Sequence, residues 1–181
     1  MRFEISYDET VWAIMPEPDA EADGLWVAEQ RLRFAGGPFS ADLDAFESAA
    51  REALRRRREG GVTSLFFRPD AVPVTGVLHV GLLETRVADS GEPLAWLPPG
   101  VTPRIDPAVT TFATPHVASG HRIAYVSDRD GADGAPLTGL VYGLPLGDLT
   151  GYVISEQAHS DVTGLMQAHA DRIVGSLRLV A

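Results

Sequence analysis

The feature of this sequence that most constrains its fold is a series of short apolar runs separated by clusters of glycine, proline and aspartate. This spacing is typical of successive β-strands joined by turns. The stretch 97–106, which contains several prolines, predicts a long surface connection within the same domain. The predicted strands cover residues 2–7, 25–34, 62–67, 74–87, 107–113, 121–127, 137–146, 149–155 and 177–180.

Two helices are predicted, one early and one late in the chain. Ser40 suits the N-cap of a helix over 41–59, whose apolar residues recur at helical spacing and which Gly60-Gly61 would end. Ser160 or Asp161 would cap a helix over 162–174 that ends at Gly175. An antiparallel strand series with two such helices predicts a single α+β domain over 1–181, an antiparallel β-sheet flanked by helices.

A tight hairpin is predicted where the last two apolar runs meet at Gly147-Asp148, because these residue types suit a two-residue turn. Such a turn fixes the register and pairs Leu146 with Leu149. Pro145 cannot donate a hydrogen bond to a neighbouring strand, so it favours an edge or a bulge at that point. The register places these apolar side chains on one face: Leu140, Tyr142, Leu144, Leu146, Leu149 and Val153.

The opposite face of this hairpin would carry Val141, Tyr152 and Ile154, which is more apolar area than a freely solvated face should show. Because only two helices are predicted, we expect a second copy of the protein to help cover the sheet. The sequence therefore predicts a homodimer in which a sheet face or an edge contributes to the interface.

Composition excludes several chemistries and partners. The 181 residues include no Cys, Lys or Asn, and the formal net charge is −10. Without Cys there are no disulfides or thiolate zinc sites, and without Lys there is no Schiff-base chemistry or Walker-type phosphate loop. The negative charge disfavours nucleic acid and anionic membranes as partners. The strand-like start and the lack of an apolar span predict a cytoplasmic protein.

The C-terminal part of the chain carries a recurring pattern of packing residues. Its segments are Gly120-His121-Arg122-Ile123-Ala124-Tyr125-Val126, Leu140-Val141-Tyr142-Gly143-Leu144-Pro145, Gly151-Tyr152-Val153-Ile154-Ser155 and Ala170-Asp171-Arg172-Ile173-Val174-Gly175-Ser176-Leu177-Arg178. This pattern resembles that of small actinobacterial proteins with the PsbP-like fold, which end in a helix followed by a Ser-Leu-Arg or Ser-Phe-Arg step. The resemblance implies an antiparallel sheet flanked by helices.

Proteins with the PsbP-like fold include a photosystem accessory subunit, a Ran-binding factor and mycobacterial lipoproteins. Most of them are binding or accessory proteins, so the resemblance implies a non-catalytic accessory or protein-binding domain. The alternative is a small-ligand binder or an enzyme whose site is assembled from scattered residues such as His79, His121 and Tyr142. No cofactor motif is present in the sequence.

The one basic cluster is Arg55-Arg56-Arg57-Arg58, near the end of the early predicted helix. It is a candidate contact for phosphate or for an acidic protein partner. The structural alternative is that these cations stabilise the C-terminal end of the helix and form i,i+4 pairs such as Glu52–Arg56. No interleaved aromatic residues support binding of nucleic acid.

Two groups of residues invite a metal interpretation, and neither fits. The stretch Asp128-Arg129-Asp130-Gly131-Ala132-Asp133-Gly134 lacks the oxygen ligand and the glycine that an EF-hand loop needs at its fifth and sixth positions, which favours a hairpin turn. His159, Asp161, His169 and Asp171 surround the late helix, but helical geometry does not bring them together. We expect no metal, and we expect His169 to be a satisfied, partly buried histidine.

The remaining candidates are more typical of packing than of catalysis. Ser119, His121 and Asp128 could be written as a triad, but no nucleophile elbow supports one. His79 lies in an apolar run and predicts a satisfied core histidine. The three tryptophans predict packing in the core or in a groove and not cofactor stacking: Trp12, Trp26 and Trp96.

Overall fold

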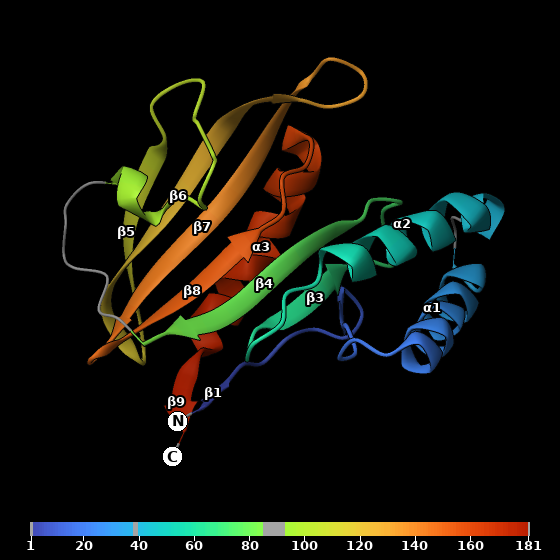
Figure 1. The fold of residues 1–181 in the computed structure, drawn as a ribbon, viewed down its shortest axis with the longest axis horizontal. Helices are drawn as coiled ribbons and strands as arrows, with labels where there is room; N and C mark the ends of the chain where they lie inside the picture. The colour runs from blue at the N-terminus through green and yellow to red at the C-terminus, as the bar shows by residue number, and fades with distance from the viewer. Residues whose placement is uncertain (1, 38–39, 85–92, 181) are drawn as a thin grey trace.

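The computed structural model describes residues 2–37, 40–84 and 93–180, and in that part of the chain it shows two antiparallel sheets and three α-helices (Figure 1). The predicted α+β architecture is confirmed. In the smaller sheet, β1 (Arg2–Glu4) pairs with β9 (Arg178–Val180). The larger sheet has the order β2-β3-β4-β8-β7-β6-β5. Its strands are β2 (Trp12–Ile14), β3 (Thr63–Phe67), β4 (Gly76–Leu83), β5 (Ala108–Thr114), β6 (Val117–Asp130), β7 (Pro136–Leu146) and β8 (Leu149–Ser155).

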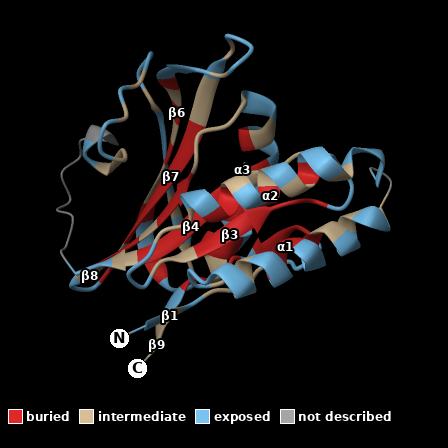
Figure 2. Cartoon of the chain, turned by 45° about the vertical axis from the view of Figure 1, so that its right-hand side comes forward, coloured by how far each residue is buried: buried red, intermediate tan, exposed pale blue. Residues whose placement is uncertain are grey.

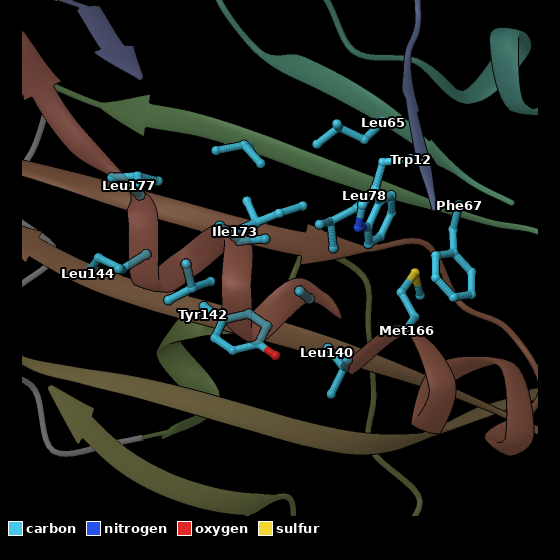
Figure 3. Packing of buried hydrophobic residues seen from close by; sticks show 14 of the residues in the cluster. Trp12, Leu65, Phe67, Leu78, Leu140, Tyr142, Leu144, Met166, Ile173 and Leu177 are labelled. Carbon is cyan, nitrogen blue, oxygen red and sulfur yellow. The ribbon is translucent and has the colours of Figure 1, made fainter. Parts of the chain in front are cut away.

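One face of the large sheet is covered by α3 (Ser160–Ser176). The residues that this helix buries, among them Met166, Ala170 and Ile173, recur every three or four positions, so one side of the helix meets the sheet. They form the main core with side chains from the central strands, including Leu78 and Tyr142 (Figure 3). Burial of this apolar side chain set is the largest stabilising contribution to the fold.

The opposite face is covered over β2, β3 and β4 by α1 (Ala20–Ala35) and α2 (Leu43–Arg56), whose buried sides face the sheet (Figure 2). Phe46 on α2 packs against Phe66 on β3, with ring centroids 5.9 Å apart. None of the helices in the described ranges is long and apolar enough to cross a membrane.

The predicted strand over 25–34 is wrong, because this segment lies inside α1. Trp26, Val27 and Gln30 are buried on one side of the helix, whereas a strand would place the neighbours Trp26 and Val27 on opposite faces. The Asp19 side chain caps the helix by accepting a hydrogen bond from the Ala22 backbone N–H at 2.8 Å. A capped run rich in Ala, Leu, Glu and Arg outweighs the β-propensity of its few aromatic and branched residues.

The helix ends differ from the predicted ones. The predicted cap Ser40 instead opens a short 3₁₀ turn, η1 (Ser40–Asp42), and Asp42 is the N-cap residue of α2. In α3 the N-cap position is held by His159, whose side chain makes no capping hydrogen bond. Gly175 does not end this helix, because the chain leaves it through extended backbone at Leu177 and needs no left-handed residue there.

The predicted hairpin is confirmed in its turn and its register. Leu146 pairs with Leu149 across Gly147-Asp148, and Gly147 has a φ of +69°, a conformation that favours glycine. The two faces of the hairpin divide as predicted between two separate clusters of buried side chains. Pairing of β7 with β6 stops at Gly143, so Pro145 lies where no neighbour on that side needs its missing N–H.

The second face of the hairpin is covered by the same chain. Trp96, at the end of η2 (Pro93–Trp96), packs with Leu97 and Val101 against the cluster that contains Val141. The Trp96 ring lies directly over Gly143, where a Cβ would come within 2.3 Å of it. The predicted surface connection is therefore a cover for the sheet, which removes the reason for placing a second copy on this face. The homodimer itself stays a prediction.

Candidate functional site

The two covers on this face of the sheet leave a seam between them. At the seam, residues 98–101 and Arg129 border a hollow of about 430 Å³. A second hollow, of about 210 Å³, lies beside α2. Both hollows are lined by Arg56, Glu156 and Gln157, so they adjoin, and together we call them the seam groove.

A buried chain of hydrogen bonds lies beneath the seam groove. Strand pairing places Ser64 of β3 opposite His79 of β4, and Glu156 follows directly after β8 on the same face. The Oγ of Ser64 lies 2.9 Å from Nδ1 of His79, and Oε1 of Glu156 lies 3.0 Å from Nε2. His79 is fully buried, and both of its ring nitrogens have partners. The predicted satisfied core histidine is confirmed.

The carboxylate at one end of this chain sets the role of the histidine nitrogen that contacts it. A carboxylate only accepts, so Nε2 of His79 carries a proton and donates a hydrogen bond to Glu156. At the other end, Oγ of Ser64 accepts from the backbone N–H of Arg58 at 3.0 Å. The hydrogen bond to His79, with nearby Arg58 adding charge, lowers the pKa of Glu156 although burial opposes the shift.

The order Ser64, His79, Glu156 matches that of a hydrolase triad, but the access is reversed. In a hydrolase the serine meets the substrate and the acid lies behind the histidine. Here Ser64 is 4% exposed and lines neither hollow, whereas Glu156 opens into the groove. The arrangement therefore supports positioning of the Glu156 carboxylate and not nucleophilic catalysis by Ser64.

The structure separates the four arginines of the predicted cluster. Arg55 and Arg56 both bind Glu52 on their own helix, as the structural alternative predicts. Arg57 points away from the seam groove and donates to both carboxylate oxygens of Asp23 on α1, while Arg58 lies 3.5 Å from Glu156. Only Arg56 and Arg58 line the seam groove.

Arg57 should therefore matter for stability and Arg55 should not. We expect Arg57→Ala to lower the melting temperature by about 4 °C, because it removes a bidentate, charge-assisted contact between α1 and α2. Arg55→Ala should leave the melting temperature unchanged, since its contact is an exposed pair within one helix. Differential scanning calorimetry of the two variants tests this, and equal losses would contradict the separation.

The seam groove is lined by three arginines and three carboxylates: Arg56, Arg58, Arg129, Glu52, Glu156 and Asp130. Arg129 has no ion pair within the described ranges, Glu52 binds Arg55 as well as Arg56, and Glu156 lies 3.5 Å from Arg58. Asp130 is 2.7 Å from Arg104, so with Arg55 and Arg104 added from outside the lining the guanidinium groups at the groove outnumber its carboxylates. A local cluster of guanidinium groups in a chain of net charge −10 is suited to bind a carboxylate or a phosphate.

The Asp- and Gly-rich stretch forms the turn between β6 and β7, as predicted. Gly131 N–H donates to the Ala135 carbonyl at 2.8 Å, and Gly134 has a φ of +78°. The Asp133 carboxylate accepts from the Ala135 N–H, so it stabilises the turn. His159 packs on this turn, with Nε2 3.9 Å from Asp133.

No group of three His, Cys, Asp or Glu residues within the described ranges is placed to hold a metal ion. Asp171 forms an ion pair with Arg122 at 3.0 Å and not a metal site with the histidines near it in sequence. The expectation for His169 is confirmed for its partial burial but wrong for its hydrogen bonding, because its Nδ1 is buried and has no hydrogen-bond partner in the part of the chain described. Burial lowers the pKa of His169, and its ring lies 5.8 Å from that of Phe67.

The scattered candidates do not converge. His121 and Asp128 lie on one strand, seven positions and about 23 Å apart, so no triad forms with Ser119. His79 and Tyr142 belong to opposite faces of the sheet, and no single site can include both. The tryptophans pack as predicted: Trp12 and Trp26 in the core and Trp96 over the sheet.

Ser64 and Glu156 were not predicted as site residues. They are 92 positions apart in the chain, and both contact His79 because β4 lies between β3 and β8. The one available signal was a polar residue at an apolar strand position, which Ser64 and His79 both show. Arg129 was visible only as part of a turn.

No protein-family model matches this chain, and no curated protein matches its sequence. Its function is therefore inferred from the geometry of the seam groove.

Proposed function

We propose that this protein is a non-catalytic accessory domain that binds an acidic segment of a partner protein in the seam groove. The observation that carries the proposal is the convergence of Arg56, Arg58 and Arg129 on one groove of an otherwise acidic chain. Guanidinium groups bind carboxylates through paired hydrogen bonds. Two adjoining hollows favour an extended peptide over a compact small molecule.

The second part of the proposal concerns the fold family. We propose that the fold is PsbP-like, because the segments that carry the resemblance form β6, β7, β8 and α3 in succession, a sheet with its covering helix. An accessory role is typical of proteins with that fold. A cytoplasmic location stays a prediction from the sequence.

The proposal is tested with a fluorescent glutamate-rich peptide of about eight residues, long enough in extended form to span the groove. Fluorescence anisotropy at low ionic strength should show binding that weakens as salt is added. The double variant Arg56→Ala, Arg129→Ala should bind about tenfold more weakly, because two charge-assisted contacts are lost.

The matched control is Arg172→Ala, which removes an exposed arginine from α3 on the opposite face and should leave the peptide affinity unchanged. Equal affinity of all three proteins would contradict the proposal. So would tighter binding of duplex DNA than of the peptide, since that result would assign the arginines to phosphate.

A further inference from the structure

A cavity distinct from the seam groove lies on the other face of the sheet, between β5, β6 and the C-terminal half of α3. Its volume is about 280 Å³, and it shares no lining residue with the seam groove. Most of its wall is apolar and comes from Phe112, Pro115 and Val174. This cavity is therefore a separate feature from the arginine-lined groove.

A polar cluster is placed within this apolar wall. The hydroxyl of Tyr142 donates to Oδ1 of Asp171 at 2.8 Å, and Nη1 of Arg122 lies 3.0 Å from Oδ2. Tyr142 is 1% exposed and lies between β7 and α3 (Figure 3). Its burial, together with the neighbouring Asp171 carboxylate, raises the pKa of Tyr142, so the phenol stays protonated and continues to donate.

The cluster can still both donate and accept hydrogen bonds. Arg122 has N–H groups beyond the one that binds Asp171, and the Asp171 carboxylate has lone pairs beyond those that accept from Tyr142 and Arg122. The charges of Arg122 and Asp171 balance each other. A carboxylate placed here would face Asp171 and an ammonium group would face Arg122, whereas a hydroxyl can donate to one and accept from the other.

We propose that this cavity binds a small neutral aromatic alcohol of the phenol class. The ring would lie against Phe112 and Val174, and the hydroxyl would join the cluster of Arg122, Tyr142 and Asp171. A cavity of about 280 Å³ is just below the usual range of about 300–1,000 Å³ for ligand pockets and has room for a single ring. The proposal is independent of the acidic partner assigned to the seam groove.

The test uses p-cresol as the probe, with toluene and 4-methylbenzoate as comparators of the same ring. Isothermal titration calorimetry of the full chain should give a dissociation constant of about 1 mM or lower for p-cresol. Toluene should bind about tenfold more weakly, because it leaves the polar cluster without a partner. 4-Methylbenzoate should bind more weakly than p-cresol because its carboxylate would face Asp171.

Two variants assign the binding to this cavity. Gly175→Leu should abolish it, since Gly175 lines the cavity and has open space where a side chain would project. Gly164→Leu is the matched control on the same helix, also with open space and remote from the cavity, and should bind p-cresol like the parent. Tyr142→Phe, which keeps the ring, should weaken p-cresol but not toluene.

Three results would overturn the proposal. The first is no heat of p-cresol binding at about 10 mM ligand, a concentration that would detect even a weak single-ring complex. The second is equal affinity for toluene and p-cresol, which would remove the role of the polar cluster. The third is binding that survives Gly175→Leu in a folded protein.

Discussion

Replacing His79 by leucine should lower the free energy of unfolding by about 3 kcal/mol or more. The side chain is fully buried, and the leucine would fill most of its volume without replacing its hydrogen bonds. Ser64 would keep the Arg58 N–H but lose the second partner of its hydroxyl, and Glu156 would keep a partly buried carboxylate beside an apolar group. Each unsatisfied buried polar group costs about 1–3 kcal/mol, more where it is charged. Urea denaturation monitored by tryptophan fluorescence measures the loss.

The pH dependence of stability identifies the cause of that loss. In the parent protein the pKa of Glu156 is held below its ordinary value of 4.5, so its contribution is present above about pH 4.5 and is lost as the pH falls through the lowered value. In His79→Leu the main cause of that shift is gone, and this acid-dependent part of the stability should shrink. His116→Leu, at an exposed histidine, should alter neither quantity. An unchanged acid dependence in His79→Leu would contradict the assigned role of His79.

Gly143→Ala should destabilise the protein by about 1–3 kcal/mol, although it adds a single methyl group. That methyl group would lie within 2.6 Å of three atoms of the Trp96 ring, so the ring must move away from the sheet. Its displacement exposes part of the cluster that contains Ile123 and Val141. The expected readouts are a lower urea midpoint and a red shift of tryptophan emission in the folded protein.

Gly164→Ala is the control for this substitution. Gly164 lies in α3 and has nothing within 4 Å of the position that a Cβ would take. Alanine is favoured over glycine inside a helix by up to about 1 kcal/mol, so this variant should be at least as stable as the parent. If Gly143→Ala proved equally harmless, the segment that contains Trp96 would not be the cover that the structure shows.

Local patterns predict the parts of this fold in which one cause dominates. The hairpin at Gly147-Asp148 follows from its turn residues and from the alternation of side chains between the two faces of a strand. Together these fix the register without help from the rest of the chain. The strand predicted over 25–34 is wrong because the signal for a helix, the cap at Asp19, lies outside that apolar run. The covering role of Trp96, Leu97 and Val101 depends on the close approach of the Trp96 ring to Gly143, which spacing along the chain cannot show.

The candidate sites depend on topology to a greater degree. Arg55 to Arg58 are consecutive in sequence, but the turn of the helix and the exit of the chain at its end send them to three different partners. Only two of them reach the seam groove, and the third arginine there, Arg129, comes from β6. Such convergence depends on the order of strands in the sheet, and local sequence patterns do not predict that order.

The pairing of β1 with β9 has a consequence for how the chain reaches its native state. Ser6 N–H donates to Oγ of Ser176 at 2.8 Å, across 170 positions of sequence. On the ribosome the first strand emerges long before its partner is made, so it must wait unpaired while the hairpins between them assemble. Contacts of such separation form late and slow the overall rate. The small sheet is thus expected to be the final step of folding, closing only after α3 has docked.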